Sequence, residues 1–157
     1  MSEIMQALYR GDDDSARELA KSAELDVFEA AALGDAARLR ELLGADSKLA
    51  HARSDDDFTA LHYAAFFDGP ETALLLVDHG ADVNAFADNE LGVHPLNSAV
   101  AAGRLEVAAI LLKHGADPNA TTRGGFTPLD AARQNGDEKL AELLRSHGAR
   151  DEPTPST

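Results

Sequence analysis

Residues 74–85 read Leu-Leu-Leu-Val-Asp-His-Gly-Ala-Asp-Val-Asn-Ala, and this stretch decides the fold because most of it recurs twice further along the chain. Residues 110–120 read Ile-Leu-Leu-Lys-His-Gly-Ala-Asp-Pro-Asn-Ala, and residues 143–149 read Leu-Leu-Arg-Ser-His-Gly-Ala. The shared His-Gly pair returns at intervals of 35 and 33 residues. A period in this range indicates a repeat protein, in which copies of one supersecondary unit are stacked in a row.

A second motif precedes each copy at the same spacing. It reads Thr-Ala-Leu-His at 59–62, His-Pro-Leu-Asn at 94–97 and Thr-Pro-Leu-Asp at 127–130. Thr is a good helix N-cap, and Pro128 suits the first helical position, where its missing N–H costs nothing; His94 is a poorer cap. The Gly of each His-Gly pair is the usual residue at a helix C-terminus. Each unit is therefore predicted to contain a helix, a tight turn, a second helix and a loop.

These motifs together resemble the ankyrin repeat. The resemblance rests on Thr-Pro-Leu, the alanine pairs after it, a turn glycine, a Leu-rich second helix and Gly-Ala-Asp-Val-Asn-Ala, all at one period. It is strongest over residues 54–151 and continues more loosely upstream, where residues 4–11 look like part of a degenerate helix pair without a loop arm. The resemblance implies an all-α ankyrin-repeat solenoid of about five helix-turn-helix units with short β-hairpin or loop fingers.

The repeats also suggest the domain organisation. We expect residues 1–151 to form a single ankyrin repeat domain and residues 152–157, Glu-Pro-Thr-Pro-Ser-Thr, to be a disordered tail. The first and last units are expected to cap the array, because each has only one neighbour. The units are expected at approximately 1–23, 24–53, 54–87, 88–122 and 123–151.

The composition argues against several classes of function. The 157 residues include 14 Lys and Arg against 28 Asp and Glu, and the formal net charge of −14 opposes binding to nucleic acids and to anionic membranes. The chain has no cysteine, which excludes a disulfide scaffold and a thiol nucleophile and is compatible with a reducing compartment. No basic-then-apolar leader and no apolar stretch of about 20 residues is present. We therefore expect a cytoplasmic protein whose partner is neither nucleic acid nor membrane.

The family resemblance implies where a partner binds. In ankyrin-like folds the most accessible side chains lie in the finger just before the Thr-Pro-Leu motif and in the last turn of the first helix, which lines a concave groove. The polar edge of this groove is expected to include Tyr9 and Arg10 at one end, Asp55 and Asp56 at one finger tip, and Arg123 at another. The same positions place apolar side chains at its centre: Phe58, Phe66, Phe67, Leu91, Val93 and Phe126, with Tyr63 beside them.

An apolar centre with aromatic anchors and a polar rim is typical of a protein-binding surface. We therefore predict a non-catalytic module that binds another protein, with the acidic finger 55–57 steering a basic or amphipathic segment. Two alternatives stay open: the Phe side chains fold inward to fill space left by small alanines, or the same patch forms a homodimer. The finger at 87–90 is two residues longer than its successor, either through neutral drift or to reach a partner.

Catalytic and metal-binding chemistry has little support in the sequence. His79, His114 and His147 recur at the end of a helix, where they interact favourably with the last carbonyl groups. Neighbouring copies are expected about 10 Å apart, too far to share a metal ion. The chain contains no His-Glu-x-x-His, no phosphate-binding glycine loop and no Gly-x-Ser-x-Gly elbow. We expect no enzymatic activity, no metal and no cofactor.

Overall fold

The computed structural model describes residues 1–151. The predicted tail, residues 152–157, lies outside the described residues. Residues 1–151 hold one short 3₁₀-helix, Ser47–His51, and no β-strand. Their ten α-helices are α1 (Glu3–Tyr9), α2 (Asp13–Ala20), α3 (Val27–Leu33), α4 (Ala36–Ala45), α5 (Ala60–Phe66), α6 (Pro70–Asp78), α7 (Pro95–Ala101), α8 (Leu105–Lys113), α9 (Pro128–Gln134) and α10 (Glu138–Ser146).

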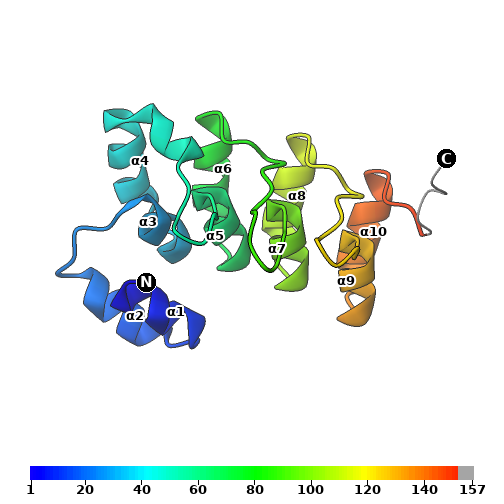
Figure 1. Ribbon diagram of the computed structural model, residues 1–157, viewed down its shortest axis with the longest axis horizontal. Coiled ribbons are helices and arrows are strands. Elements are labelled where there is room, and N and C mark those ends of the chain that lie inside the picture. Colours follow the sequence, from blue (N-terminus) through cyan, green and yellow to red (C-terminus); the bar gives the residue numbers. More distant parts are fainter. Residues whose placement is uncertain (152–157) are drawn as a thin grey trace.

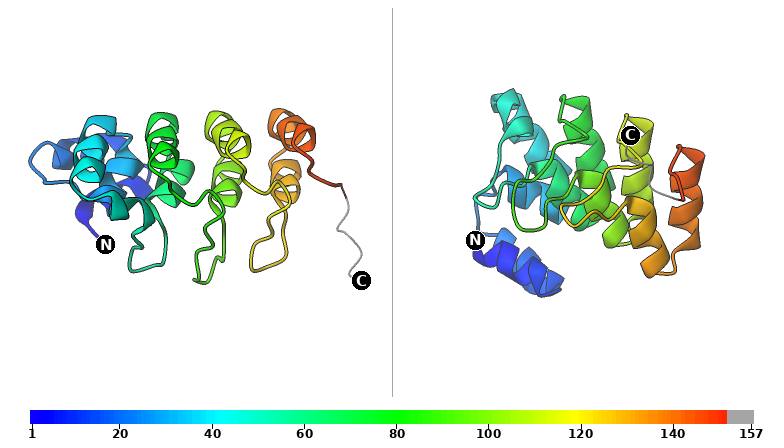
Figure 2. Two further views of the ribbon diagram at one scale, coloured as in Figure 1. Left: turned by 90° about the horizontal axis from the view of Figure 1, so that it is seen from above. Right: turned by 45° about the vertical axis from the view of Figure 1, so that its right-hand side comes forward.

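The helices form five pairs, and the last four pairs stack in a row (Figure 1). Helices α3, α5, α7 and α9 pack side by side in one layer, and α4, α6, α8 and α10 form a second layer. The loops before α5, α7 and α9 project to one side of the row, as the left view of Figure 2 shows. This architecture confirms the predicted all-α solenoid.

Three fingers project from the array, and each is a loop closed by a backbone hydrogen bond. The N–H of Ser54 donates to the carbonyl of Phe58 over 2.8 Å, and that of Thr122 donates to Phe126 over 2.9 Å. The longer finger at 87–93 is closed in the same way between its end residues. One isolated antiparallel bridge, Arg53 with Thr59, is the nearest approach to a hairpin.

Local capping explains where the first helix of each repeat begins. The hydroxyl oxygens of Thr59 and Thr127 accept from the backbone N–H groups three residues later, as the N-cap prediction requires. At His94, the weaker cap, the side-chain oxygen of Asn97 reaches back and accepts from the His94 N–H over 2.8 Å. In all three repeats the side chain three residues after the N-cap therefore accepts the N–H of the N-cap residue; these side chains are His62, Asn97 and Asp130.

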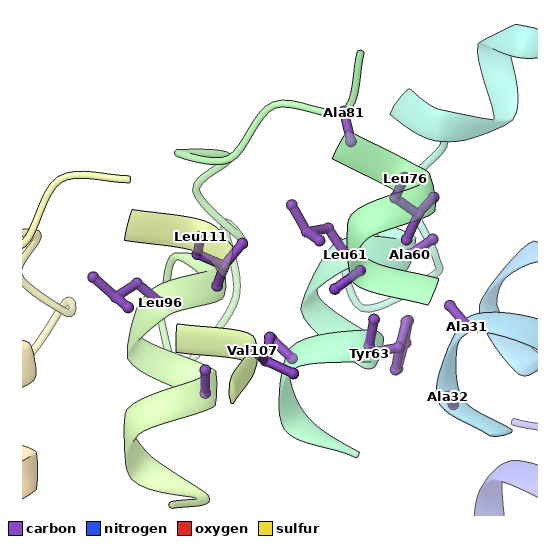
Figure 3. Close-up of a cluster of buried hydrophobic side chains, with 14 of the residues drawn as sticks. Ala31, Ala32, Ala60, Leu61, Tyr63, Leu76, Ala81, Leu96, Val107 and Leu111 are labelled. Atoms are coloured by element: carbon purple, nitrogen blue, oxygen red, sulfur yellow. The ribbon is translucent and has the colours of Figure 1, made fainter. Parts of the chain in front are cut away.

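The core is built from leucine and alanine. Corresponding leucines of the first helix in three repeats, Leu61, Leu96 and Leu129, are at most 1% exposed, as are their second-helix counterparts Leu76 and Leu111. Figure 3 shows how Leu61, Leu76, Leu96 and Leu111 lie between the two helix layers. Alanines at the closest approach of the helices are fully buried, and a larger side chain there would force the helices apart.

Two aspartates adopt a backbone conformation that usually requires glycine. Asp68 has φ 63° where the other repeats have Gly34, Gly103 and Gly136, and Asp57 has φ 64° at a finger turn. Asp occupies the left-handed region more readily than most residues other than glycine. The turn and the finger therefore keep the shape of their counterparts despite the substitutions.

The N-terminal pair, α1 and α2, departs from the regular stack. In Figure 1 and in the right view of Figure 2 it lies below the neighbouring pairs, with its helices turned away from their direction. Helix α1 packs against α2 and α3, and the apolar side chains Ile4, Met5 and Leu8 are buried. The pair lacks a finger, so no finger contact aligns it with the neighbouring repeat. Its position is set instead by the burial of its apolar side chains.

Candidate functional site

The concave side of the array contains an apolar cavity of about 340 Å³. Its walls come from α5, α7, α9 and the three fingers, and one side chain, Tyr9, comes from α1. We call this cavity and its surroundings the groove. Its apolar lining includes six of the side chains that the sequence predicts for a binding surface: Phe58, Tyr63, Phe66, Leu91, Val93 and Phe126.

These side chains differ in how far they reach solvent. Leu91 is 64% exposed, Phe126 54% and Phe66 41%, whereas Phe58 and Val93 are half-buried. Large apolar side chains at such exposure are unusual when they gather in one place. The exposed ones come from two fingers and one helix end, so only the stacking of repeats brings them together.

Phe67 lies behind this lining rather than in it. Its ring is 4.9 Å from the ring of Phe66 and 5.1 Å from that of Tyr9, both in edge-on geometry. The Tyr9 ring is also 6.2 Å from Phe66. The three rings form an aromatic cluster at the α5 end of the groove. Tyr9 thus lies at the α5 end of the groove, where the turned N-terminal pair brings it next to the third repeat.

Tyr63 forms part of the floor of the groove. It is 7% exposed, packs against the rings of Phe28 and Phe58, and donates its hydroxyl to Ser54 Oγ over 2.9 Å. Burial raises the pKa of Tyr63, and nearby carboxylates such as Asp56 add to this effect. Burial likewise raises the pKa of Tyr9 to about 12, with smaller contributions from Tyr63 and Asp56. Both phenols are therefore neutral at physiological pH.

Carboxylates surround the aromatic cluster on its finger side. Asp55 and Asp56 are exposed, and among the described residues neither side chain has an ion-pair partner. A second cavity, of about 540 Å³, lies between α1 and this finger; its charged lining side chains are four carboxylates, Asp55, Asp56, Asp26 and Glu29, and one guanidinium, that of Arg53. Burial, and then the proximity of Glu29, raise the pKa of Asp26. The edge of the groove next to Tyr9 and Tyr63 is therefore strongly acidic.

Arg123 and the two-residue insertion hold the fingers together. The Arg123 guanidinium donates to Asp88 Oδ1 over 2.6 Å and to the Asn89 carbonyl over 3.0 Å, and it lies over the Phe86 ring. On the other side, the Asn89 side chain donates to the Asp56 carbonyl over 2.7 Å. The longer finger thus bridges its two neighbours, a role that the sequence did not reveal because each contact joins residues more than 30 positions apart.

Two of the three histidines that recur at the ends of second helices have a backbone carbonyl as partner. The Nδ1 atoms of His79 and His114 lie 2.8 Å from the carbonyl oxygens of Leu75 and Ile110, as the sequence predicts for helix C-termini. Within residues 1–151, no group of three or more His, Asp or Glu side chains is placed to hold a metal ion. In the same part of the chain, no helix is long and apolar enough to cross a membrane.

A comparison with protein families matches this architecture. The family model for ankyrin repeats, in three copies, matches residues 4–122 and 85–154. The chain belongs to the ankyrin repeat family. Ankyrin repeats are generally protein-protein interaction modules.

Curated relatives resemble this ankyrin repeat chain over part of their length. ARF GTPase-activating protein GIT2 of Mus musculus is 41% identical over 98 residues, which is 59% of this chain and 14% of that protein. BCL-6 corepressor-like protein 1 of Homo sapiens is 35% identical over 65% of this chain and 5% of its own length. E3 ubiquitin-protein ligase Ufd4 of Drosophila melanogaster is 34% identical over 73% of this chain and 4% of its own length. The chain therefore spans at most 14% of these relatives.

Proposed function

We propose that this ankyrin repeat chain is a non-catalytic binding module whose groove takes a partner protein segment with bulky apolar and basic side chains. The observation that supports this most directly is the exposed apolar cavity of about 340 Å³ on the concave side. Three large apolar side chains, Phe66, Leu91 and Phe126, remain more than 40% exposed around it. Burying them against a partner removes apolar surface from water, which is the main driving force of protein association.

Charge supports the basic character of the partner segment. The net charge is −14, and within residues 1–151 the carboxylates of Asp55 and Asp56, beside the aromatic cluster, have no ion-pair partner. A Lys or Arg next to the apolar anchor of a partner would meet these carboxylates. Such complementarity raises the association rate and orients the partner. Arg123 contributes indirectly in this proposal, because its guanidinium is engaged with the neighbouring finger.

The groove also shows which kind of side chain it accepts. The Tyr9 ring, from a different part of the chain, already packs on Phe66 and Phe67. An aromatic side chain is thus compatible with the shape of the groove at its α5 end. The Tyr and Trp side chains that dominate many protein interfaces combine such an apolar ring with a polar tip.

Self-association through the same patch is less favourable on electrostatic grounds. Two copies would each carry a charge of −14, and the acidic finger lies next to the patch. Like charges at an interface disfavour that pairing. We further propose a cytoplasmic location, which agrees with a chain that has no cysteine.

The proposal can be tested by panning phage-displayed random peptides on the purified protein. We expect the selected peptides to combine Lys or Arg with aromatic or Leu side chains, and their binding to weaken as salt is added. The double variant Leu91→Ser, Phe126→Ser should lose them, since both side chains are exposed and their loss should leave the fold intact. The matched control is Leu74→Ser, Leu105→Ser, two residues that are each 40% exposed on the outer helices α6 and α8.

Peptides that bind both double variants equally would show that the groove is not the binding surface. A shift of the wild-type protein to dimers in sedimentation, lost only in the groove variant, would favour self-association instead.

A further inference from the structure

One position in the groove is covered in a way that the repeat architecture does not explain. Ala32 of α3 corresponds to Phe66, Ala101 and Gln134 in the three following repeats. Those three residues are exposed, whereas Ala32 is only 4% exposed. The surroundings of Ala32 differ from those of its counterparts in two ways: the N-terminal pair packs on α3, and the next repeat carries Phe66 and Phe67. The Tyr9 ring lies on both of these rings, so the N-terminal pair contributes to covering this end of the groove.

The contact between this pair and the array is entirely apolar. Within the described residues, no hydrogen bond and no ion pair joins residues 1–23 to residues 24–151. The contact instead consists of buried apolar side chains of α1 and of the Tyr9 ring on Phe66 and Phe67. Such contacts lack the directional bonds that hold an element in one place.

The other repeats are joined to each other quite differently. Thr72 donates to the Ala31 carbonyl over 3.1 Å, and Arg104 Nε donates to the Phe66 carbonyl over 3.0 Å. Asn135 donates in the same way to Ala101 over 3.1 Å. Every junction between neighbouring repeats from α3 to α10 thus has at least one hydrogen bond, and the N-terminal pair is the exception.

The connection to α3 leaves room for movement. Residues 21–26 run from α2 to α3 outside any helix, as Figure 1 shows. Leu25 is buried and its carbonyl accepts from Arg38, so the stretch that can extend is residues 21–24, which spans up to about 13 Å. Helices of seven and eight residues are only marginally stable by themselves, so the pair depends on its contact with the groove.

We propose that the N-terminal helix pair is a displaceable lid that covers the α3–α5 end of the groove when no partner is bound. A partner's aromatic or apolar side chain takes the place of Tyr9 on Phe66 and Phe67, and the pair moves away from α3. The lid therefore makes binding compete with an intramolecular contact, which lowers the affinity and gives a site at which it can be regulated. This proposal rests on the groove being the binding surface.

The absence of native cysteines allows a direct test on the protein alone. The variant Ala32→Cys places a thiol under the lid. The matched control, Ala30→Cys, places one in the same helix at a position that is fully buried in every repeat: Ala30, Ala64, Ala99 and Ala132 are each 0% exposed. The reaction of each thiol with the neutral reagent 4,4′-dithiodipyridine is timed, and its rate is divided by the rate for the same variant unfolded in urea.

We expect the thiol of Ala32→Cys to react at least about ten times faster than that of Ala30→Cys, because it needs only lid release and not unfolding of the repeat. Adding Tyr9→Ala should accelerate the reaction of the Ala32→Cys thiol about ten-fold, because the contacts of the Tyr9 ring with Phe66 and Phe67 are lost. It should change the reaction of the Ala30→Cys thiol little. Adding Gln6→Ala, an exposed residue of the same helix, should change neither.

Equal rates for the two thiols, with or without Tyr9→Ala, would overturn the proposal, since the pair would then separate only when the array unfolds. This experiment uses no partner, so its outcome does not depend on the peptide binding that tests the proposed function.

Discussion

His62 should make the stability of this protein depend on pH in a defined window. Its ring is 2% exposed and lies between two repeats. Nδ1 lies 3.1 Å from the backbone nitrogen of Thr59 and accepts its hydrogen bond, so the ring proton is on Nε2, which donates to the Val93 carbonyl over 3.0 Å. A proton added at Nδ1 would face the Thr59 N–H and break that bond. The buried ring therefore stays neutral.

The size of the effect follows from the shift in pKa. Burial, partly offset by the hydrogen bond to Val93, lowers the pKa of His62 from 6.5 to about 4. Between these values the unfolded chain binds more protons than the folded one, so stability falls as the pH falls. One pKa unit corresponds to about 1.4 kcal/mol, so about 3 kcal/mol is lost below pH 4, and about 2 kcal/mol of this is lost by about pH 5. That is a large share of the stability of a typical domain.

The assay is urea unfolding between about pH 7 and pH 4.5, with His62→Gln as the control. Gln at this position keeps an acceptor for the Thr59 N–H but does not titrate. The free energy of unfolding of the wild type should fall more steeply with acidification than that of His62→Gln, by about 2 kcal/mol at about pH 5. Parallel curves would refute the reasoning, because they would mean that the buried ring gains its proton as readily as in the unfolded chain.

Three further substitutions test separate features. Asp68→Gly should raise the melting temperature by a few degrees, about 0.5–1 kcal/mol, because φ is 63° and no side-chain hydrogen bond of Asp68 is found in residues 1–151. Asn89→Ala removes the bond to the Asp56 carbonyl and the bonds that Asn89 Oδ1 accepts from the Leu91 and Gly92 N–H groups, and it should speed amide hydrogen exchange in the finger at 87–93, while the helices keep their protection. Thr72→Val removes the buried hydroxyl that bonds Ala31 and should cost about 1–2 kcal/mol in urea unfolding, whereas Thr72→Ser should cost less.

Much of the fold can be predicted from the sequence because repeats depend on local signals. The N-caps at Thr59 and Thr127, the positive φ at Gly80 and Gly115, and the histidines at helix ends each involve residues within a few positions of each other. The repetition then indicates which helix faces pack against the neighbouring unit, because similar units bury the same positions. For the same reason, six of the seven apolar residues expected at the groove do line it, whereas Phe67 lies behind them; whether they bind a partner stays a prediction.

The sequence by itself determined the helix-turn-helix units, their number and the Leu-Ala core. Only the tertiary structure decided where the N-terminal pair sits, and hence that Tyr9 lies on Phe66 and Phe67 and that Ala32 is covered. It also decided that the longer finger, through Asn89, bridges its neighbours. The physical reason is the same in both cases. A repeating pattern specifies contacts between equivalent positions of neighbouring units. The position of a unit that lacks a finger, or of a finger that gains two residues, depends instead on packing and hydrogen bonds with residues far away in the sequence, and these cannot be read from the local sequence.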